Sequence, residues 1–241
     1  MSTLSSDTLI NPQDLFDLTV TTSAIASGAT IGCLATTGDG RYFRYVQMGA
    51  VAAVPGQLYQ APAEVVANER VAMAAAAIGA TQLVTTGAIT VTANQYTGGY
   101  AMVAVTPGQG YSYQIGTHAA FTAAAATFNL VDPVIVALTT SSTVSFVANP
   151  YTNIIVNPTT ASSSIVGVAV AALPAAAFGW VQTKGAATVL AQGTIVVGTE
   201  VAASATTAGA VVATSGVLAA VGYAMQGITA TQYGPICLNI T

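Results

Sequence analysis

Apolar and polar side chains alternate in short runs along this chain. Residues 43–47 are Phe-Arg-Tyr-Val-Gln and residues 178–182 are Phe-Gly-Trp-Val-Gln, so each run places its aromatic rings on one face. A period of two is the spacing of an extended strand, because successive side chains point to opposite sides of the backbone. Val, Thr, Ile and Tyr, which favour strands, are plentiful. The pattern therefore predicts an all-β protein.

These two runs belong to an internal repeat. Residues 31–47 match residues 166–182 without a gap, and in each copy a later glycine, Gly56 or Gly193, begins a second expected strand. Two matching units indicate two related β-layers around one core. We expect a β-sandwich or barrel-like body built from two related halves, residues 28–80 together with residues 159–241.

A different segment, residues 81–158, separates the two copies. It contains short strand-like runs bounded by turn residues such as Gly98-Gly99 and Pro107–Gly110. The expected strands are Ile89–Thr92, Tyr100–Val105, Tyr111–Ile115, Val134–Leu138 and Val144–Val147. We interpret this segment as an inserted subdomain, an antiparallel β-meander.

Four tyrosines cluster around the turn at Pro107–Gly110. A tyrosine ring offers an apolar face and a polar tip, which suits the binding of a sugar or a receptor. The alternative, which we favour, is cross-strand aromatic packing inside the subdomain. The candidate partner-binding residues of this segment are Tyr96, Tyr100, Tyr111 and Tyr113.

Residues 1–27 are expected to form an extended N-terminal arm with a short helix. Asn11 can cap this helix, with Pro12 at its first position. Its apolar side would consist of Leu15, Phe16 and Leu18. The arm would dock on a neighbouring subunit, which makes these three residues candidate partner-binding residues, or it would pack on its own domain.

Charged residues are scarce in this sequence, which favours a subunit of an assembly over a free domain. Charged residues make up 5% of the 241 residues, against about 25% in an average soluble domain. Four basic and eight acidic residues leave a net charge of −4, so we expect no nucleic-acid partner and no anionic membrane surface. A surface with so few charges is difficult to keep soluble in a free monomer. We therefore expect partner subunits to cover much of it.

The stretch Ile165–Val181 approaches the length of a membrane-spanning helix and carries no charged side chain. Pro174 lies in its middle, and the matching stretch of the first copy contains Asp39, Arg41 and Arg44. Two copies of one fold cannot lie in water in one place and in lipid in the other. The sequence therefore predicts no membrane-spanning segment here.

Residues suited to catalysis or metal binding are few. His118 is the single histidine, and the sequence contains no Gly-x-Ser-x-Gly motif whose serine it could activate. We expect His118 on the surface or in a loop. Cys33 and Cys237 lack the spacing of metal ligands. We interpret both cysteines as reduced, buried small side chains, with a Cys33–Cys237 disulfide as the alternative. We predict no enzymatic activity and no cofactor.

Several runs resemble a family of tailed-bacteriophage virion proteins, the capsid decoration or cement proteins. These runs are Asn94–Tyr100, Pro107–Ile115, Asp132–Leu138, Asn149–Tyr151, Phe178–Gln182 and Tyr233–Pro235. The resemblance covers roughly residues 30–241, so the N-terminal arm lies outside it. The motifs are structural rather than catalytic, and no catalytic residue is carried over.

The resemblance implies a β-rich structural protein on the outer surface of the phage head. Its expected partners are the major capsid protein and copies of itself, since such proteins are often homotrimers at three-fold positions. Two other functions remain open. One is a host-surface adhesin that uses the tyrosine-rich segment, and the other is a different virion component, such as a tail or connector protein.

Overall fold

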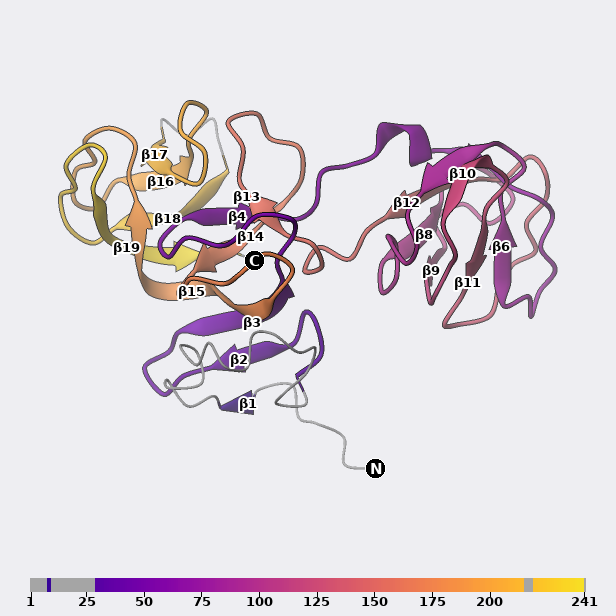
Figure 1. The fold of residues 1–241 in the computed structure, drawn as a ribbon, viewed down its shortest axis with the longest axis horizontal. Coiled ribbons are helices and arrows are strands. Elements are labelled where there is room, and N and C mark those ends of the chain that lie inside the picture. Colours follow the sequence, from indigo (N-terminus) through magenta and orange to yellow (C-terminus); the bar gives the residue numbers. More distant parts are fainter. Residues whose placement is uncertain (1–7, 10–28, 215–218, 241) are drawn as a thin grey trace. The chain divides into compact units, whose positions relative to one another are not determined.

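The computed structural model describes residues 8–9, 29–214 and 219–240 (Figure 1). Strands and one short 3-10 helix, η2 (Val66–Asn68), are the regular elements of this described part. The all-β prediction is confirmed. The described residues group into two compact units. The body comprises those up to Pro62 and from Pro150 onward, and the insert comprises Ala63–Asn149.

The insert begins and ends earlier than the expected range of residues 81–158. Strand β5 (Val71–Ala72) pairs with β12 (Thr143–Val147), which places the residues before position 81 in the insert. Strand β13 (Ile155–Val156) pairs with β4 (Leu58–Gln60), which places the residues after Asn149 in the body. Backbone pairing, which composition does not reveal, therefore sets the two boundaries.

One curled, mostly antiparallel sheet of 11 strands makes up the body (Figure 1). Its main path runs through β1 (Thr8–Leu9), β2 (Leu34–Thr36), β3 (Tyr42–Gln47), β15 (Phe178–Leu190), β19 (Tyr233–Asn239), β18 (Ala220–Ala224), β16 (Glu200–Ala203) and β17 (Val211–Ala213). Strand β14 (Ile165–Ala169) pairs with both β15 and β4. The apolar stretch Ile165–Val181 is therefore a β-hairpin. Across the described residues, no helix is long and apolar enough to cross a membrane.

The two copies of the repeat pair with each other around an approximate two-fold axis. Phe43 pairs with Gln182, and their repeat counterparts, Phe178 and Gln47, pair in the same way. At the centre Tyr45 pairs with its own counterpart Trp180, and the two ring centroids are 5.0 Å apart. The copies therefore lie side by side in one sheet, where we had expected two layers that face each other.

The copies already differ within their hairpins, because Leu34 pairs with Arg44 whereas the equivalent Ala169 pairs with Val181. They differ further outside the hairpins. Strand β4, which follows Gly56, pairs with β14 of the second copy. The matching residues after Gly193 form only an isolated bridge between Ile195 and Ile228. The outer edge of β2 is instead occupied by β1, in parallel. The expected second strand is thus present in the first copy and absent after Gly193, within the described residues.

The insert folds by nested pairing of its eight strands rather than as a meander. Strand β5 pairs with β12, β6 with β11, β7 with β10, and β8 with β9. The bounds not yet given are β6 (Gln82–Val84), β7 (Ile89–Val91), β8 (Tyr100–Val103), β9 (Ser112–Gln114), β10 (Phe121–Ala124) and β11 (Thr127–Asn129). Nested pairing is the order found in jelly rolls, although β12 also pairs with β8 here. A shared strand order does not establish a shared function.

The expected strand Val134–Leu138 is not formed. Val134 and Leu138 are both buried, but Leu138 makes only an isolated bridge to Ala76. The apolar content of this run therefore reflects burial in the core of the insert rather than strand pairing. The sequence prediction also missed β10 and β11, which are short and contain alanine and asparagine.

Candidate functional site

The structure separates the four tyrosines that sequence analysis grouped together. Tyr96 and Tyr113 are 2% and 3% exposed, whereas Tyr100 and Tyr111 are 40% and 41% exposed. Tyr113 pairs with Ala101, and both side chains point into the core. Tyr100 precedes Ala101 on the same strand, so its side chain points to the opposite face. The four rings therefore form no common platform. Tyr96 and Tyr113 are not accessible to a partner.

Tyr96 belongs to a buried aromatic cluster in the insert. Its ring lies 5.8 Å from Phe146 and 6.2 Å from Phe128, and these two phenylalanines stack at 4.2 Å between centroids. Asn68 donates a 2.7 Å hydrogen bond to the Tyr96 hydroxyl. Burial raises the pKa of that phenol. These contacts describe a residue that stabilises the core rather than one that binds a sugar.

His118 is part of the same cluster: it lies in the loop between β9 and β10, as one expected alternative had it, but it is buried, so the surface alternative is wrong. Its side chain is 5% exposed and its ring centroid lies 4.9 Å from Phe128. Nε2 accepts a 3.0 Å hydrogen bond from the Tyr96 backbone N–H, so Nδ1 carries the proton and donates to the Ala119 carbonyl at 2.9 Å. Both ring nitrogens are engaged. His118 therefore orients a loop and has no nitrogen left for a metal or a nucleophile.

Three predicted site residues, Leu15, Phe16 and Leu18, lie outside the described residues. Cys33 and Cys237 are both free thiols, as we expected, but they are half-buried rather than buried. Burial raises the pKa of the Cys33 thiol. No group of three or more His, Cys, Asp or Glu side chains suited to a metal ion occurs in the part of the chain that the structure describes.

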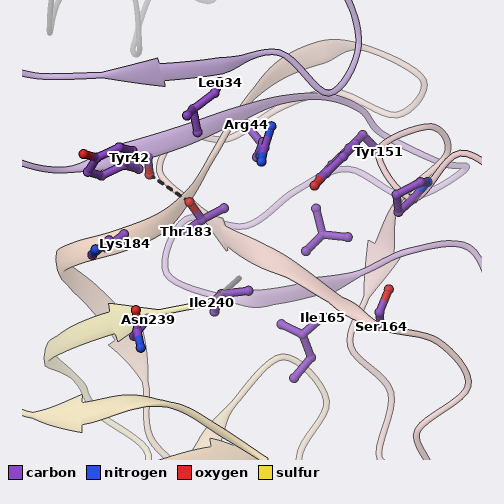
Figure 2. A pocket seen from close by; sticks show the side chains of 12 residues that line it. Leu34, Tyr42, Arg44, Tyr151, Ser164, Ile165, Thr183, Lys184, Asn239 and Ile240 are labelled. Carbon is purple, nitrogen blue, oxygen red and sulfur yellow. Dashed lines mark hydrogen bonds between the residues drawn. The ribbon is translucent and has the colours of Figure 1, made fainter. Parts of the chain in front are cut away.

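Sequence analysis missed a pocket in the body. It has a volume of about 260 Å³, and its walls come from β2, β3, β14, β15, the end of β19 and the loop at Pro150-Tyr151 (Figure 2). Two of the four basic residues of the chain, Arg44 and Lys184, line it. The sequence contained one signal for this site, because Arg44 stands where the second copy has Gly179.

An irregularity in β15 positions Lys184 at the pocket. β15 pairs with β3 up to Lys184 and with β19 from Lys184 onward, so Lys184 has both Tyr42 and Asn239 as cross-strand partners. The register shifts at Thr183, and Gly185 follows with φ +87°, a value that favours glycine. The Gln182 side-chain amide donates to the Lys184 and Ala186 carbonyls at 3.0 and 2.9 Å. These bonds support the bend between the two halves of the strand.

Aromatic rings hold both cations of the pocket (Figure 2). The guanidinium carbon of Arg44 lies 5.4 Å from the Tyr151 ring centroid, and its Nη1 donates a 2.9 Å hydrogen bond to the Gly32 carbonyl. The ammonium of Lys184 lies 5.5 Å from the Tyr42 ring centroid. Cations at these distances are attracted to the ring faces. The two charged groups are therefore positioned before any ligand arrives.

Neither cation of the pocket has a carboxylate partner among the described residues. The only ion pair found there joins Arg41 to Asp39, at 2.8 Å. The Thr37 hydroxyl, which donates to the Asp39 carboxylate, and then Arg41 lower the pKa of Asp39. Asp39 is thus engaged at the tip of the β2–β3 hairpin. The lining residues that the structure describes include no acidic side chain.

The end of the sheet related to the pocket by the approximate two-fold axis is closed. There Ala177 and Gly179 stand in place of Tyr42 and Arg44, and both are buried. Leu173, 2% exposed, covers them so closely that a Cβ on Gly179 would lie 2.5 Å from its Cδ2. The same sheet face is therefore filled by a leucine at one end and open and cationic at the other.

The insert presents a second accessible feature, the outer face of its four-stranded sheet β5-β12-β8-β9. On it Tyr100 pairs with Val147, and both are exposed. Met102, 42% exposed, lies between Ser145 and Ser112. Strands β8, β9 and β12 contribute no charged side chain to this face. The exposed Arg70, whose backbone N–H donates to Ser145 Oγ at 3.1 Å, lies at its β5 edge.

Comparisons with protein-family models, curated proteins and solved structures give no match for this chain. The function therefore has to be inferred from the two accessible features and from the composition. One is the cationic pocket of the body, and the other is the outer face of the insert.

Proposed function

We propose that this protein is a structural component of a virus particle. It acts as a decoration or cement protein that binds the outer surface of a tailed-phage head and stabilises the capsid. Its partners are the major capsid protein and further copies of itself, arranged as a homotrimer. The proposal assigns it no catalytic step and no cofactor.

The outer face of the insert, which has no charged side chain on β8, β9 or β12, is the observation that carries this proposal. Tyr100, Met102 and Val147 are exposed there beside serine side chains. Tyrosine and methionine are enriched, and charged residues depleted, in the buried centres of protein interfaces. Large apolar side chains exposed together on a sheet face are otherwise a liability for a free protein. The scarcity of charge in the whole chain and the resemblance to phage virion proteins support the same interpretation.

The physics of capsid stabilisation requires no special chemistry. A protein that binds the assembled lattice and not the free subunits stabilises the lattice by mass action. Several weak contacts per copy, repeated over many copies, add avidity. Broad contacts between small β-forming side chains are sufficient for this role.

Binding to capsids that lack the protein tests the proposal. We expect stoichiometric co-sedimentation of the purified protein with expanded capsids, and capsids that rupture at a higher temperature once it is bound. Met102→Glu should weaken binding by about tenfold or more, because it buries a charge in the contact. Met225→Glu is the matched control, since Met225 is 45% exposed in the body. Capsids that are equally robust with and without the protein would contradict the proposal.

A host-surface adhesin is the second candidate function, and the exposed rings of Tyr100 and Tyr111 favour it. Purified protein would then compete with virions for host cells, and Tyr111→Ala would abolish that competition. Imaging of intact virions separates these functions from a tail or connector protein. Decoration requires hundreds of copies over the head, whereas a connector forms one small ring.

A further inference from the structure

We propose that the pocket of the body, which both Arg44 and Lys184 line, binds a carboxylate group. The inference concerns a different unit from the outer face of the insert and does not rest on the proposed decoration role. It follows from the position of the two cations, the composition of the walls and the closed state of the related end.

The two cations face the same space without compensation. Arg44 lies two residues from Tyr42 on β3, and Lys184 is the cross-strand partner of Tyr42. They are therefore diagonal neighbours on one sheet face, and both line the pocket. Neither has a carboxylate partner among the described residues, so an anion in the pocket would be attracted by both positive charges.

The walls favour a carboxylate on an apolar stem over a phosphate. Leu34, Ile165 and Ile240 supply apolar surface, while Ser164 and Asn239 supply polar groups (Figure 2). A guanidinium binds a carboxylate through two parallel hydrogen bonds. Phosphate sites commonly use a run of free backbone N–H groups. At this pocket the Ile240 N–H already donates to the Thr183 carbonyl, at 2.9 Å.

The size of the pocket limits the ligand to a small group. Its volume of about 260 Å³ lies below the roughly 300–1,000 Å³ of pockets that enclose drug-sized ligands. The carboxylate would thus come from a small organic acid or from an acidic side chain of a partner protein. Both sources share the same chemistry, and the experiment separates them.

The fold itself does not require an open, cationic pocket at this position. At the related end, the loop of the differently paired β14–β15 hairpin places Leu173 against Gly179. At the pocket, two larger polar side chains, Tyr42 and Arg44, replace Ala177 and Gly179 and leave the space open. A packed end would stabilise the fold more than an open one. The open, cationic end therefore indicates a binding function.

Titration of the full-length protein with three probes tests the proposal by nuclear magnetic resonance. The probes are acetate, the blocked peptide acetyl-Gly-Glu-Gly-amide and inorganic phosphate. We expect saturable shifts at pocket residues with both carboxylates, weaker binding at high salt, and an affinity about tenfold lower in Lys184→Gln. Arg44→Gln should have a similar effect. Arg70→Gln, which removes an exposed cation of the insert, should have none.

Three results would overturn the assignment: no saturable shift with either carboxylate, tighter binding of phosphate than of both carboxylates, or unchanged affinity in Lys184→Gln. Lys184 is exposed, so this variant keeps the test decisive even if Arg44→Gln, which also loses its bond to Gly32, fails to fold. Equal affinity for acetate and peptide identifies a small-acid site. Tighter binding of the peptide identifies an acidic side chain of a partner, and both outcomes support the proposal.

Discussion

The two ends of one sheet face, related by the approximate two-fold axis at Tyr45 and Trp180, have opposite structures. At the end in the second copy, Gly179 lies beneath Leu173 and the surface is closed. At the end in the first copy, Arg44 replaces that glycine and a polar pocket opens. The pairing between the copies is symmetric, but the hairpins differ: Leu34 pairs with Arg44, whereas the equivalent Ala169 pairs with Val181 and not with Gly179. The loop that carries Leu173 and the side chains on β3 and β15 together produce the difference. A duplicated unit can thus keep the pairing between its copies while one copy serves packing and the other presents a site.

The largest expected effect comes from making the closed end resemble the open one. Gly179→Arg should lower the free energy of unfolding by about 4 kcal/mol, because it displaces Leu173 and buries an unpaired guanidinium. Urea unfolding followed by the fluorescence of Trp180, the single tryptophan, measures the loss. Gly38→Arg is the control, since a Cβ on Gly38 would meet nothing within 4 Å. Equal losses in the two variants would show that Leu173 does not restrict this position.

Removing the side chain that fills the closed end should have the next largest effect. Leu173→Ala should cost about 3 kcal/mol, since it leaves a cavity over Ala177 and Gly179. Leu34→Ala, in the half-exposed wall of the pocket, should cost only about 1 kcal/mol. The same urea measurement compares the two. Equal losses of unfolding free energy in the two variants would contradict the contrast between a packed and an open end.

A smaller loss is expected when the open end loses its guanidinium. Arg44→Ala should lower stability by about 1.5 kcal/mol, because the hydrogen bond to Gly32 and the contact with Tyr151 disappear. Arg44→Lys should recover little of this, since an ammonium lacks the planar fork of donors. Thermal unfolding provides the measurement. Arg70→Ala, at an exposed position of the insert, should stay within about 0.5 kcal/mol of the parent.

The smallest effect concerns Asp39, for which the second copy has Pro174. The Thr37 hydroxyl, and then Arg41, hold the pKa of Asp39 below its usual 3.8. A lowered pKa in the folded state means that the stabilisation is present above the unfolded value and is lost as the pH falls through the folded value. As the pH is lowered from about 5 to about 2, the free energy of unfolding should therefore decrease slightly more for the parent than for Asp39→Asn. Because Asp39 is exposed, salt should weaken the difference, and a larger pH dependence in Asp39→Asn would contradict this account.

Several features of the fold could be predicted because they depend on local pattern. The period-two alternation of Phe43–Gln47 and Phe178–Gln182 identified β3 and the start of β15. Matching the two copies identified them as related. The same kind of pattern failed at Val134–Leu138, because an apolar run can be buried as an irregular segment as well as a strand.

The candidate sites were less predictable because accessibility is not a local property. Tyr96 and Tyr100 lie four residues apart in the sequence, but one lies in the aromatic core and the other on the outer face. His118 follows a strand, as expected, and is nevertheless buried by the turn at Tyr96. The pocket joins residues more than 200 positions apart, from Leu34 to Ile240, and no local pattern connects them.

The sequence by itself determined that this protein is all-β, that it contains a repeated hairpin, and that its surface is poor in charge. These properties follow from side-chain period, self-similarity and composition. The tertiary structure decided that the two hairpins pair in one sheet, that the insert folds by nested pairing, and that Arg44 and Lys184 line one pocket. The physical reason is that each strand offers two edges whose hydrogen-bonding groups accept many partners. Only the packing of the complete chain selects among them.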